Sequence, residues 1–204
     1  ETTIGALVAT GAVGPERLAY GAPRDMLLGL QYIDSSGSMV TAGGRVVKNV
    51  AGYDMTRLLT GSLGTLGFIT EATWRIGTRP DTCKRISGSG TIDECFAAGL
   101  KIVNSNILAA LVTIAPEAGL ATLTVGFEGL ELVVDSQLER CREVMNAGGL
   151  NVSEAEQYPV VDGFLAPAFA SIWEAPFVLQ ADVVIKHGAE CVAQLSQNST
   201  PSSL

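Results

Sequence analysis

The pattern of apolar and polar residues predicts a β-hairpin early in the chain. Leu27 to Ile33 is a compact apolar run, which is typical of a buried strand. The turn-forming residues Asp34-Ser35-Ser36-Gly37 follow it, and Ser38 to Ala42 can return as the second strand.

A short helix and a further strand are expected before residue 80. The helix runs from Tyr53 to Thr60 and ends at Gly61, because glycine commonly terminates helices. Phe68 to Ile76 has the period of two that marks a strand. The alternation assigns to one face Phe68, Thr70, Ala72, Trp74 and Ile76, and to the other Ile69, Glu71, Thr73 and Arg75.

The residues after 80 begin with a helix that has a clear start signal. Thr91-Ile92-Asp93-Glu94 is a capping box, in which Thr91 accepts a hydrogen bond from the backbone of Glu94 while Glu94 reaches back. The apolar stripe expected on this helix consists of Ile92, Phe96, Leu100 and Val103.

Two strands and a second helix follow. The strands are expected at Leu108 to Ile114 and Ala121 to Phe127, around a turn from Ala115 to Gly119. The helix ends at Gly148-Gly149, and its apolar stripe consists of Leu130, Val134, Leu138, Cys141 and Met145.

Short strands near Lys84 to Ser87 and Leu150 to Glu156 complete the order β-α-β-β-α-β, which is the split βαβ unit of ferredoxin-like folds. Beyond Tyr158, Phe177 to Ile185 has strand character and Gly188 to Leu195 helix character. A lone strand and helix cannot bury both faces, so we expect this end of the chain to be truncated.

Composition indicates a folded protein in two parts. The chain has 204 residues, of which 47% are hydrophobic and 17% charged, and its net charge is −8. Seven Lys and Arg stand against six Asp and Glu up to Pro80, but six against fifteen from Asp81 onward. This change predicts a domain boundary at Thr78-Arg79-Pro80-Asp81. The acidic balance argues against nucleic acid as a partner, and no apolar run approaches the roughly 18 residues of a transmembrane segment.

Cysteine and histidine usage gives little support for metal chemistry. No two of the four cysteines lie within about ten residues of each other, so none has the close spacing of zinc or iron–sulfur ligands. We expect reduced, mostly buried thiols and no metal site. The single histidine, His187, leaves little room for histidine-centred catalysis.

Glycines are the strongest local feature of the first 70 residues. Glycine lets backbone N–H groups approach a phosphate or a ring closely. The spacing Gly61-x-x-Gly64-x-x-Gly67 is not the dinucleotide fingerprint G-x-G-x-x-G, and it opens a strand instead of a helix. On composition alone, these glycines could serve tight turns only.

Three ordered segments carry a resemblance to a known family. They are Thr3 to Gly21 with Arg24-Asp25, Gly43 to Met55, which contains K-N-V-A-G-Y-D, and Gly61 to Glu71, which has the pattern G-S-x-G-T-L-G-x-I-T-E. They resemble the vanillyl-alcohol oxidase superfamily of flavoproteins with PCMH-type FAD-binding domains, and they are most similar to the FAD-binding subunits of bacterial glycolate oxidases. The resemblance covers roughly residues 1 to 77.

The resemblance implies an α+β fold in which residues 1–80 form the second subdomain of a PCMH-type FAD-binding domain and residues 81–204 a ferredoxin-like cap. It implies FAD contacts near the pyrophosphate and ring from Ile4, Gly5, Thr10, Gly11 and Gly14. It implies contacts at the adenosine end from Gly64, Gly67 and Ile69, with Tyr20 and Gly21 as further candidates. The motifs contain no attachment histidine, so the FAD would be noncovalent.

The sequence departs from the family pattern in two places. The N-terminal subdomain with its own pyrophosphate loop is absent, and the chain starts at Glu1 without a methionine, so we expect a fragment that alone binds FAD poorly or not at all. Gly5-Ala6 also stands where the family has Gly-Gly.

No catalytic residue can be assigned. Oxidation of a hydroxy acid needs a base for the hydroxyl proton and a cation for the carboxylate. The candidate cations are Arg17, Arg24, Arg45 and Lys48. Tyr53 and Asp54 are expected to start a helix instead, with Asp54 at its positive end.

The leading hypothesis is a fragment of a FAD-dependent oxidoreductase of glycolate or another 2-hydroxy acid. The resemblance implies a catalytic flavin subunit and an iron–sulfur subunit as partners, and a location in the cytoplasm or peripherally at the inner membrane through those partners. The alternative is a non-catalytic assembly module, derived from a flavin domain, whose acidic cap docks partner subunits. An unrelated ferredoxin-like ligand-binding protein would not explain the long motifs.

Overall fold

The computed structural model describes residues 3–44, 53–117 and 119–158, which form two compact units. Unit 1 consists of residues 1–14 and 20–78, and unit 2 of residues 15–19 and 79–204. Helix α2 (Arg17–Tyr20) contributes to both. The strand expected over 177–185 and the helix over 188–195 lie outside the described residues.

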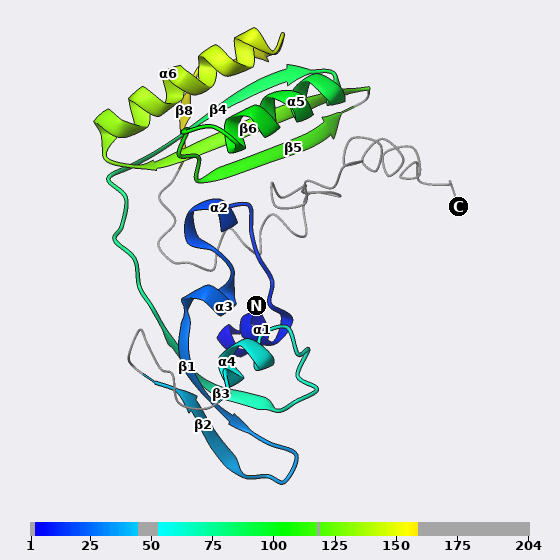
Figure 1. Cartoon of the computed structure of the whole chain (residues 1–204), viewed down its shortest axis with the longest axis vertical. Helices are drawn as coiled ribbons and strands as arrows, with labels where there is room; N and C mark the ends of the chain where they lie inside the picture. Colours follow the sequence, from blue (N-terminus) through cyan, green and yellow to red (C-terminus); the bar gives the residue numbers. More distant parts are fainter. Residues whose placement is uncertain (1–2, 45–52, 118, 159–204) are drawn as a thin grey trace. The chain divides into compact units, whose positions relative to one another are not determined.

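Unit 1 is built on an antiparallel sheet of three strands in the order β2-β1-β3 (Figure 1). Strand β1 (Leu27–Ile33) lies between β2 (Met39–Gly43) and β3 (Phe68–Trp74). The predicted hairpin is confirmed. Its turn is held by the carboxylate of Asp34, whose Oδ1 accepts hydrogen bonds from the backbone N–H groups of Ser36 at 2.8 Å and Ser38 at 3.0 Å.

Three helices accompany this sheet: α1 (Ile4–Thr10), α3 (Pro23–Met26) and α4 (Met55–Leu59). Helix α4 confirms the expected helix and begins at Asp54, whose carboxylate accepts a hydrogen bond from Arg57 N at 3.1 Å. The core of unit 1 consists of the buried residues Val8, Leu27, Leu30, Tyr32 and Leu59.

Helix α1 was not predicted, because its segment is rich in glycine. It forms because both ends are capped. The hydroxyl of Thr3 accepts from Ala6 N at 3.1 Å, and Gly11 takes the left-handed conformation and donates to Leu7 O at 2.9 Å. The glycine-rich segment is therefore partly helical.

Strand β3 corrects the predicted assignment of faces. Ile69 pairs with Tyr32 and Glu71 with the preceding residue of β1, so Thr70 is an extra residue in a β-bulge. The bulge turns Ile69 into the core beside Ala72, whereas Phe68 is 72% exposed. Strict alternation had placed Phe68 with Ala72, and that prediction is wrong because alternation assumes an uninterrupted ladder.

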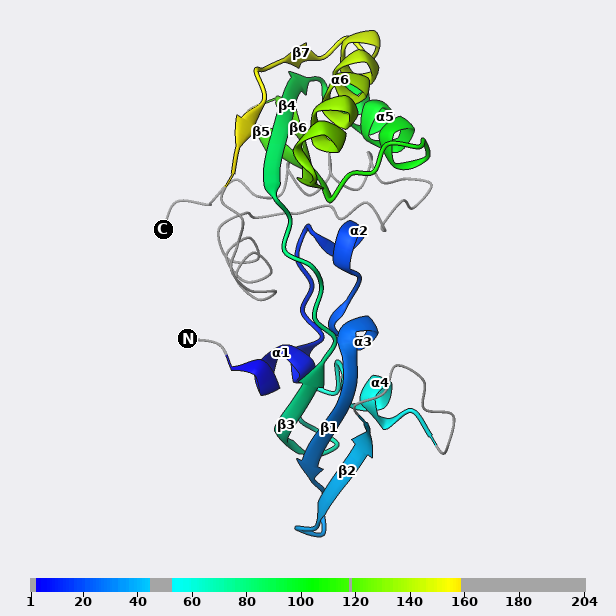
Figure 2. The same ribbon diagram turned by 90° about the vertical axis from the view of Figure 1, so that its left-hand side faces the viewer.

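Unit 2 has the expected β-α-β-β-α-β order. Strands β4 (Thr82–Gly90), β5 (Leu111–Glu117), β6 (Leu120–Gly129) and β7 (Asn151–Val152) form an antiparallel sheet in the order β5-β6-β4-β7, and β8 (Glu156–Gln157) also pairs with β4. Helices α5 (Ile92–Val103) and α6 (Glu131–Ala147) cover one face of this sheet (Figure 2). This is a ferredoxin-like arrangement.

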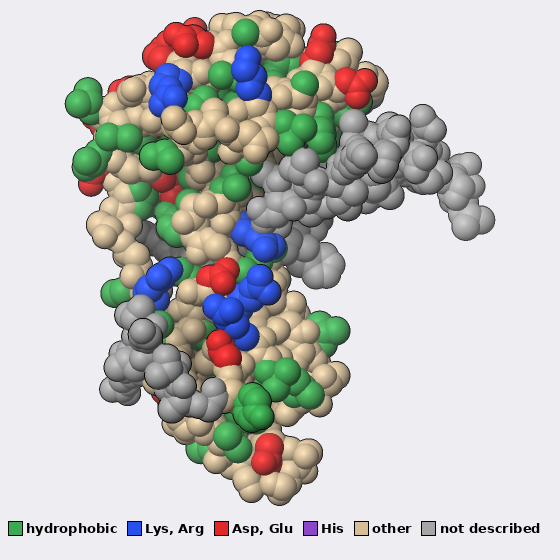
Figure 3. Space-filling view, in the orientation of Figure 1, with side chains coloured by type: hydrophobic (Ala, Val, Ile, Leu, Met, Phe, Trp, Pro, Cys, Tyr) green, Lys and Arg blue, Asp and Glu red, His purple; other side chains and the backbone are tan. Residues whose placement is uncertain are grey.

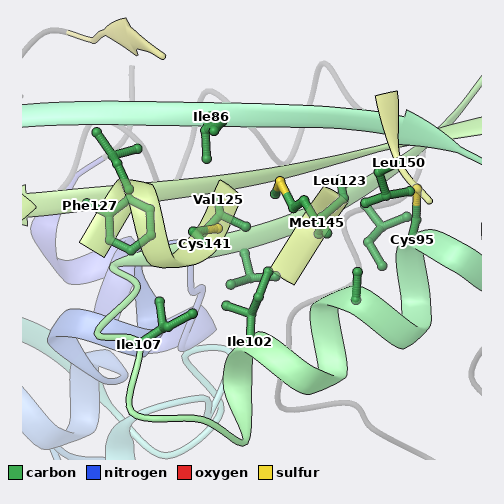
Figure 4. Packing of buried hydrophobic residues seen from close by; sticks show 14 of the residues in the cluster. Ile86, Cys95, Ile102, Ile107, Leu123, Val125, Phe127, Cys141, Met145 and Leu150 are labelled. Carbon is green, nitrogen blue, oxygen red and sulfur yellow. The ribbon is translucent and has the colours of Figure 1, made fainter. Parts of the chain in front are cut away.

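The core of unit 2 lies between these helices and the sheet (Figure 4). Helix α6 buries the predicted residues Val134, Leu138, Cys141 and Met145, but Leu130 is its N-cap and is 63% exposed. The predicted stripe of α5 is displaced, because the helix buries Cys95, Ala98, Gly99 and Ile102 while Ile92, Phe96 and Val103 are only partly buried. Gly99 faces the sheet, where an added Cβ would lie 3.5 Å from the side chain of Leu123 and 3.8 Å from that of Ile114.

Strand β5 differs from its predicted bounds. It begins at Leu111 instead of Leu108 and continues through the expected turn to Glu117, with Pro116 opposite Ala121. Proline is tolerated there because β5 is an edge strand. Among the described residues, no helix combines the length and apolar character needed to cross a membrane.

Candidate functional site

Two of the three motif segments, the one that contains α1 and Gly11 and the one that begins at Gly61, lie side by side in unit 1. Gly61 N donates a hydrogen bond to Val8 O at 2.9 Å, and Leu63 N donates to Ala9 O at 2.7 Å. Both acceptors lie in the last turn of α1, where carbonyl groups lack the usual partners further along the helix, although Val8 O also accepts a hydrogen bond from Gly11 N at 3.2 Å. The loop from Gly61 therefore satisfies the end of α1 and brings the two motif segments together.

The contact between the segments requires glycine at position 11. Gly11 has φ +63, and a Cβ there would lie 3.3 Å from the Cα of Gly61. Gly61 and Gly64 also have positive φ, at +80 and +76, but a Cβ at either position would meet nothing within 4 Å. Glycine is therefore needed at these two positions only for the backbone conformation, and there is open space beside the loop.

One polar group in this loop is unpaired. Ser62 Oγ is buried and has no hydrogen-bond partner among the described residues. A buried hydroxyl without a partner costs about 1–3 kcal/mol, so such groups are generally paired. Its neighbours Leu63 and Leu66 are 73% and 47% exposed. This loop therefore combines one unpaired buried hydroxyl with exposed apolar side chains and two glycines that face open space.

Four other predicted site residues have structural roles in unit 1. A Cβ on Gly5 would lie 3.4 Å from the carbonyl oxygen of Ile69, so the start of α1 lies beside β3. The side chain of Ile69 packs against the core. A Cβ on Gly67 would lie only 2.7 Å from the ring of Tyr32, and the hydroxyl of Thr10 donates to the carbonyl four residues earlier in α1 at 2.8 Å.

The remaining predicted contacts are placed as follows. Ile4 is 47% exposed in the first turn of α1, and Gly14 is buried. Tyr20 is the last residue of α2 and is half-buried. Gly21 has φ +77, and the chain then turns into α3, where Asp25 Oδ2 accepts from Ala22 N at 2.9 Å.

Most of the candidate charged groups that the structure describes have other surroundings within their own units. Arg24 is exposed and lies 3.8 Å from the carboxylate of Asp25, and Arg17 belongs to unit 2. Tyr53 is 95% exposed. Asp54 caps α4, and hydrogen bonds from Thr56 and from Arg57 N lower its pKa. Three candidates lie outside the described residues: Arg45, Lys48 and His187.

Unit 2 contains a titratable cluster that the sequence did not indicate. The hydroxyl of Tyr158 donates to Glu128 Oε1 at 3.0 Å. Burial is the largest cause that raises the pKa of Tyr158, and the negative charge of Glu128 raises it further. Burial and, to a smaller extent, the charge of Glu128 also raise the pKa of Glu16. They also raise the pKa of Cys83 to about 11. No short-range pattern could reveal this cluster, because its members are distant in sequence.

Within the described ranges, no group of three or more His, Cys, Asp and Glu residues is arranged to hold a metal ion. Cys83, Cys95 and Cys141 are free and buried, as expected of structural thiols. Cys191 lies outside the described residues.

Known proteins are similar in sequence to this chain, over alignments of 80 to 155 residues. Over 80 residues the chain is 46% identical to glycolate oxidase subunit GlcE of Escherichia coli, which covers 39% of this chain and 23% of that protein. Over 85 residues it is 41% identical to glycolate oxidase subunit GlcD of Bacillus subtilis. That alignment covers 42% of this chain and 18% of GlcD. Over these residues the chain is similar to parts of both glycolate oxidase subunits. It is also 31% identical over 155 residues to a mitochondrial D-lactate dehydrogenase (cytochrome) of Arabidopsis thaliana. That alignment covers 75% of this chain and 24% of the dehydrogenase.

The fold also has relatives among solved structures. An alkyldihydroxyacetonephosphate synthase aligns with 76% of this chain at a TM-score of 0.63 and 20% identity, covering 34% of that structure. This likeness confirms the predicted fold class. No protein-family model matches the chain. The chain spans about a quarter or less of each of the three relatives named above, with shares of 23%, 18% and 24%.

Proposed function

We propose that this chain is part of a FAD-dependent oxidoreductase that oxidises a small 2-hydroxy acid, as a subunit of a glycolate-oxidase-type complex. Residues 1–80 would belong to the FAD-binding domain and residues 81–204 to the cap. Bound FAD would supply the acceptor for the hydride that leaves the α-carbon, while the hydroxyl proton passes to a base and a 2-oxo acid forms. The relatives named as glycolate oxidase subunits and D-lactate dehydrogenase support this class of reaction.

The observation that carries the proposal is the contact between the two motif segments. The hydrogen bonds Gly61 N to Val8 O and Leu63 N to Ala9 O hold them together, and the adjacent Ser62 Oγ has no partner within the described part of the chain. FAD would be held noncovalently here. The proposed contacts are Ile4, Gly5, Thr10, Gly11, Gly14, Tyr20, Gly21, Gly64, Gly67 and Ile69, to which we add Ser62.

The partners would be a catalytic flavin subunit and an iron–sulfur subunit. Relatives named as two different glycolate oxidase subunits, GlcD and GlcE, support a complex of several chains. The proposed location is the cytoplasm, with peripheral attachment to the inner membrane through those subunits.

A titration with FAD tests the cofactor. Because the chain covers only part of its relatives, the titration is made on the 204-residue chain and on a fusion with the N-terminal part of E. coli GlcE placed before Glu1. Removing an unpaired buried hydroxyl costs the empty protein nothing, so Ser62→Ala should leave the free energy of unfolding unchanged or raised while weakening FAD binding. Ser35→Ala, in the hairpin turn, is the matched control. If the fusion binds no FAD in this titration, as judged by the absorbance of protein-bound flavin, the proposal is refuted and the non-catalytic assembly module is favoured.

A further inference from the structure

Five residues in the middle of the unit 1 sequence belong to unit 2. The chain of unit 1 runs to Gly14 and resumes at Tyr20, and Pro15 to Ala19 between them are part of unit 2. Leu18 packs against the hydrophobic core of unit 2 and is partly buried there. We call Pro15 to Ala19 the strap. Two of the proposed FAD contacts, Gly14 and Tyr20, are therefore the residues at which the chain enters and leaves the strap.

The strap adds a carboxyl group to the titratable cluster of unit 2. Glu128 stands opposite Cys83 in the pairing of β6 with β4, so both side chains lie on the face of the sheet opposite the core residue Phe127. Tyr158 lies on this face too, because its backbone N–H donates to Cys83 O at 3.1 Å and its hydroxyl to Glu128 Oε1 at 3.0 Å. Other Asp and Glu side chains of unit 2 are exposed over its helices (Figure 3), whereas Glu16 is half-buried.

The surroundings of Glu16 favour its neutral form. Burial is the largest cause that raises the pKa of Glu16, and the negative charge of Glu128 raises it further. A hydrogen bond from the backbone N–H of Glu16 itself lowers the pKa but does not balance the other two causes. The attached strap therefore holds this proton more tightly than a detached strap would. Its attachment is strongest below the ordinary pKa of 4.5 and weakens as the pH rises through the raised pKa.

The other titratable groups of the cluster bring no positive charge to Glu16. The hydroxyl of Tyr158 is neutral and already donates to the neighbouring carboxylate. Burial raises the pKa of the Cys83 thiol to about 11, so this group is neutral as well. Arg17 and Arg79 belong to the same unit and each takes part in an interaction, but neither is a cause of the shift in the pKa of Glu16.

The apolar anchor of the strap is small. Leu18 is the strap residue that packs against the core of unit 2, and its side chain is only partly buried. Repulsion between two carboxylates therefore acts against an apolar contact of limited area. We propose that the strap is held on unit 2 while Glu16 is protonated and is released when Glu16 and Glu128 are both ionised.

Hydrogen exchange tests the proposal on the full 204-residue chain without flavin, so its failure would leave the proposed oxidoreductase function untouched. The reporter is the amide of Ala19, which donates to Glu16 O at 3.0 Å. A single helical turn is marginal in water, so this bond protects the amide only while the strap is attached. Protection is the exchange rate of a peptide with residues 12–22 divided by that of the chain at the same pH. From pH 4.5 to pH 8 it should fall about three-fold or more.

Three substitutions identify the groups responsible. Glu16→Gln keeps the hydrogen-bonding atoms but cannot ionise, so its protection at pH 8 should stay within about two-fold of its value at pH 4.5. Glu128→Gln removes one negative charge and should lessen the fall, which the burial of Glu16 still causes in part. Glu143→Gln, at an exposed position of α6, is the matched control and should show the full fall of the wild type.

Leu18→Ala tests the same coupling in the reverse direction. Loss of the apolar anchor should detach the strap, so carbon-13 NMR should find the pKa of Glu16 lower in this variant than in the wild type. An equal pKa in the two proteins would overturn the proposal, as would protection of Ala19 that is independent of pH or a fall that persists in Glu16→Gln. A parallel loss of protection at Ile102, which is buried in α5, would overturn it too, because unit 2 would then open as a whole.

Discussion

Gly11→Ala tests whether close contact between the two motif segments stabilises unit 1. Gly11 combines a left-handed backbone with a neighbour at 3.3 Å, the Cα of Gly61. Alanine would bring a Cβ into that space. It would therefore add strain at residue 11 and also push the loop at Gly61 away from the end of α1.

The two costs can be separated. A left-handed conformation costs a non-glycine residue about 1–2 kcal/mol. Displacing the loop weakens the hydrogen bonds from Gly61 N and Leu63 N to the carbonyls of α1, each with a net value of about 1 kcal/mol. Gly11→Ala should therefore lower the free energy of unfolding by about 2–4 kcal/mol. Gly37→Ala, at φ +82 with nothing within 4 Å, should cost only the strain of about 1–2 kcal/mol.

Urea unfolding followed by tryptophan fluorescence measures both variants. The chain has two tryptophans, so a Trp173→Phe background leaves Trp74 in β3 as the reporter of unit 1. The reasoning predicts a larger loss for Gly11→Ala than for Gly37→Ala. Equal losses would refute the claim that packing between the segments contributes to stability.

Three further predictions concern unit 2. Thr91→Ala removes the capping box of α5 and should lower the free energy of unfolding by about 1 kcal/mol in urea titrations. Burial raises the pKa of Glu16 above 4.5, so the folded state holds this proton more tightly than the unfolded state. Stability should fall as the pH rises from 4.5 through the raised pKa, and Glu16→Gln should flatten this fall in denaturation midpoints measured from pH 4 to 8. Burial raises the pKa of the Cys141 thiol to about 12, so iodoacetamide at pH 8 should label it only after unfolding, as peptide mass spectrometry would reveal.

The elements that the sequence predicted well are those specified by neighbouring residues. The hairpin follows from the turn at Asp34 to Gly37, and the start of α5 from the Thr91 capping box. The buried face of α6 follows from a helical period that runs from Val134 to Met145. In each case a side chain within four residues, or a period sustained over several turns, determines the local structure.

The features that the sequence missed depend on residues distant in the chain. The bulge at Thr70 is defined by the pairing of β3 with β1, and no residue of β3 alone indicates it. The face of α5 was misassigned because its buried positions include the small residues Ala98 and Gly99, which a search for a stripe of large apolar residues does not find. The cluster of Glu16, Glu128 and Tyr158 likewise exists only after folding.

The motif glycines separate into two groups with different physical reasons, and the difference bears on the cofactor proposal. Gly11 and Gly67 are required by packing, since a Cβ would lie 3.3 Å from Gly61 and 2.7 Å from the ring of Tyr32. Packing of this kind would select glycine without any ligand. Gly61 and Gly64 face open space, and the loop could tolerate a side chain there apart from its positive φ. Because Gly61 N–H is already bonded to Val8 O, Gly64 is the one of these two open positions that our cofactor proposal uses, together with the unpaired hydroxyl of Ser62.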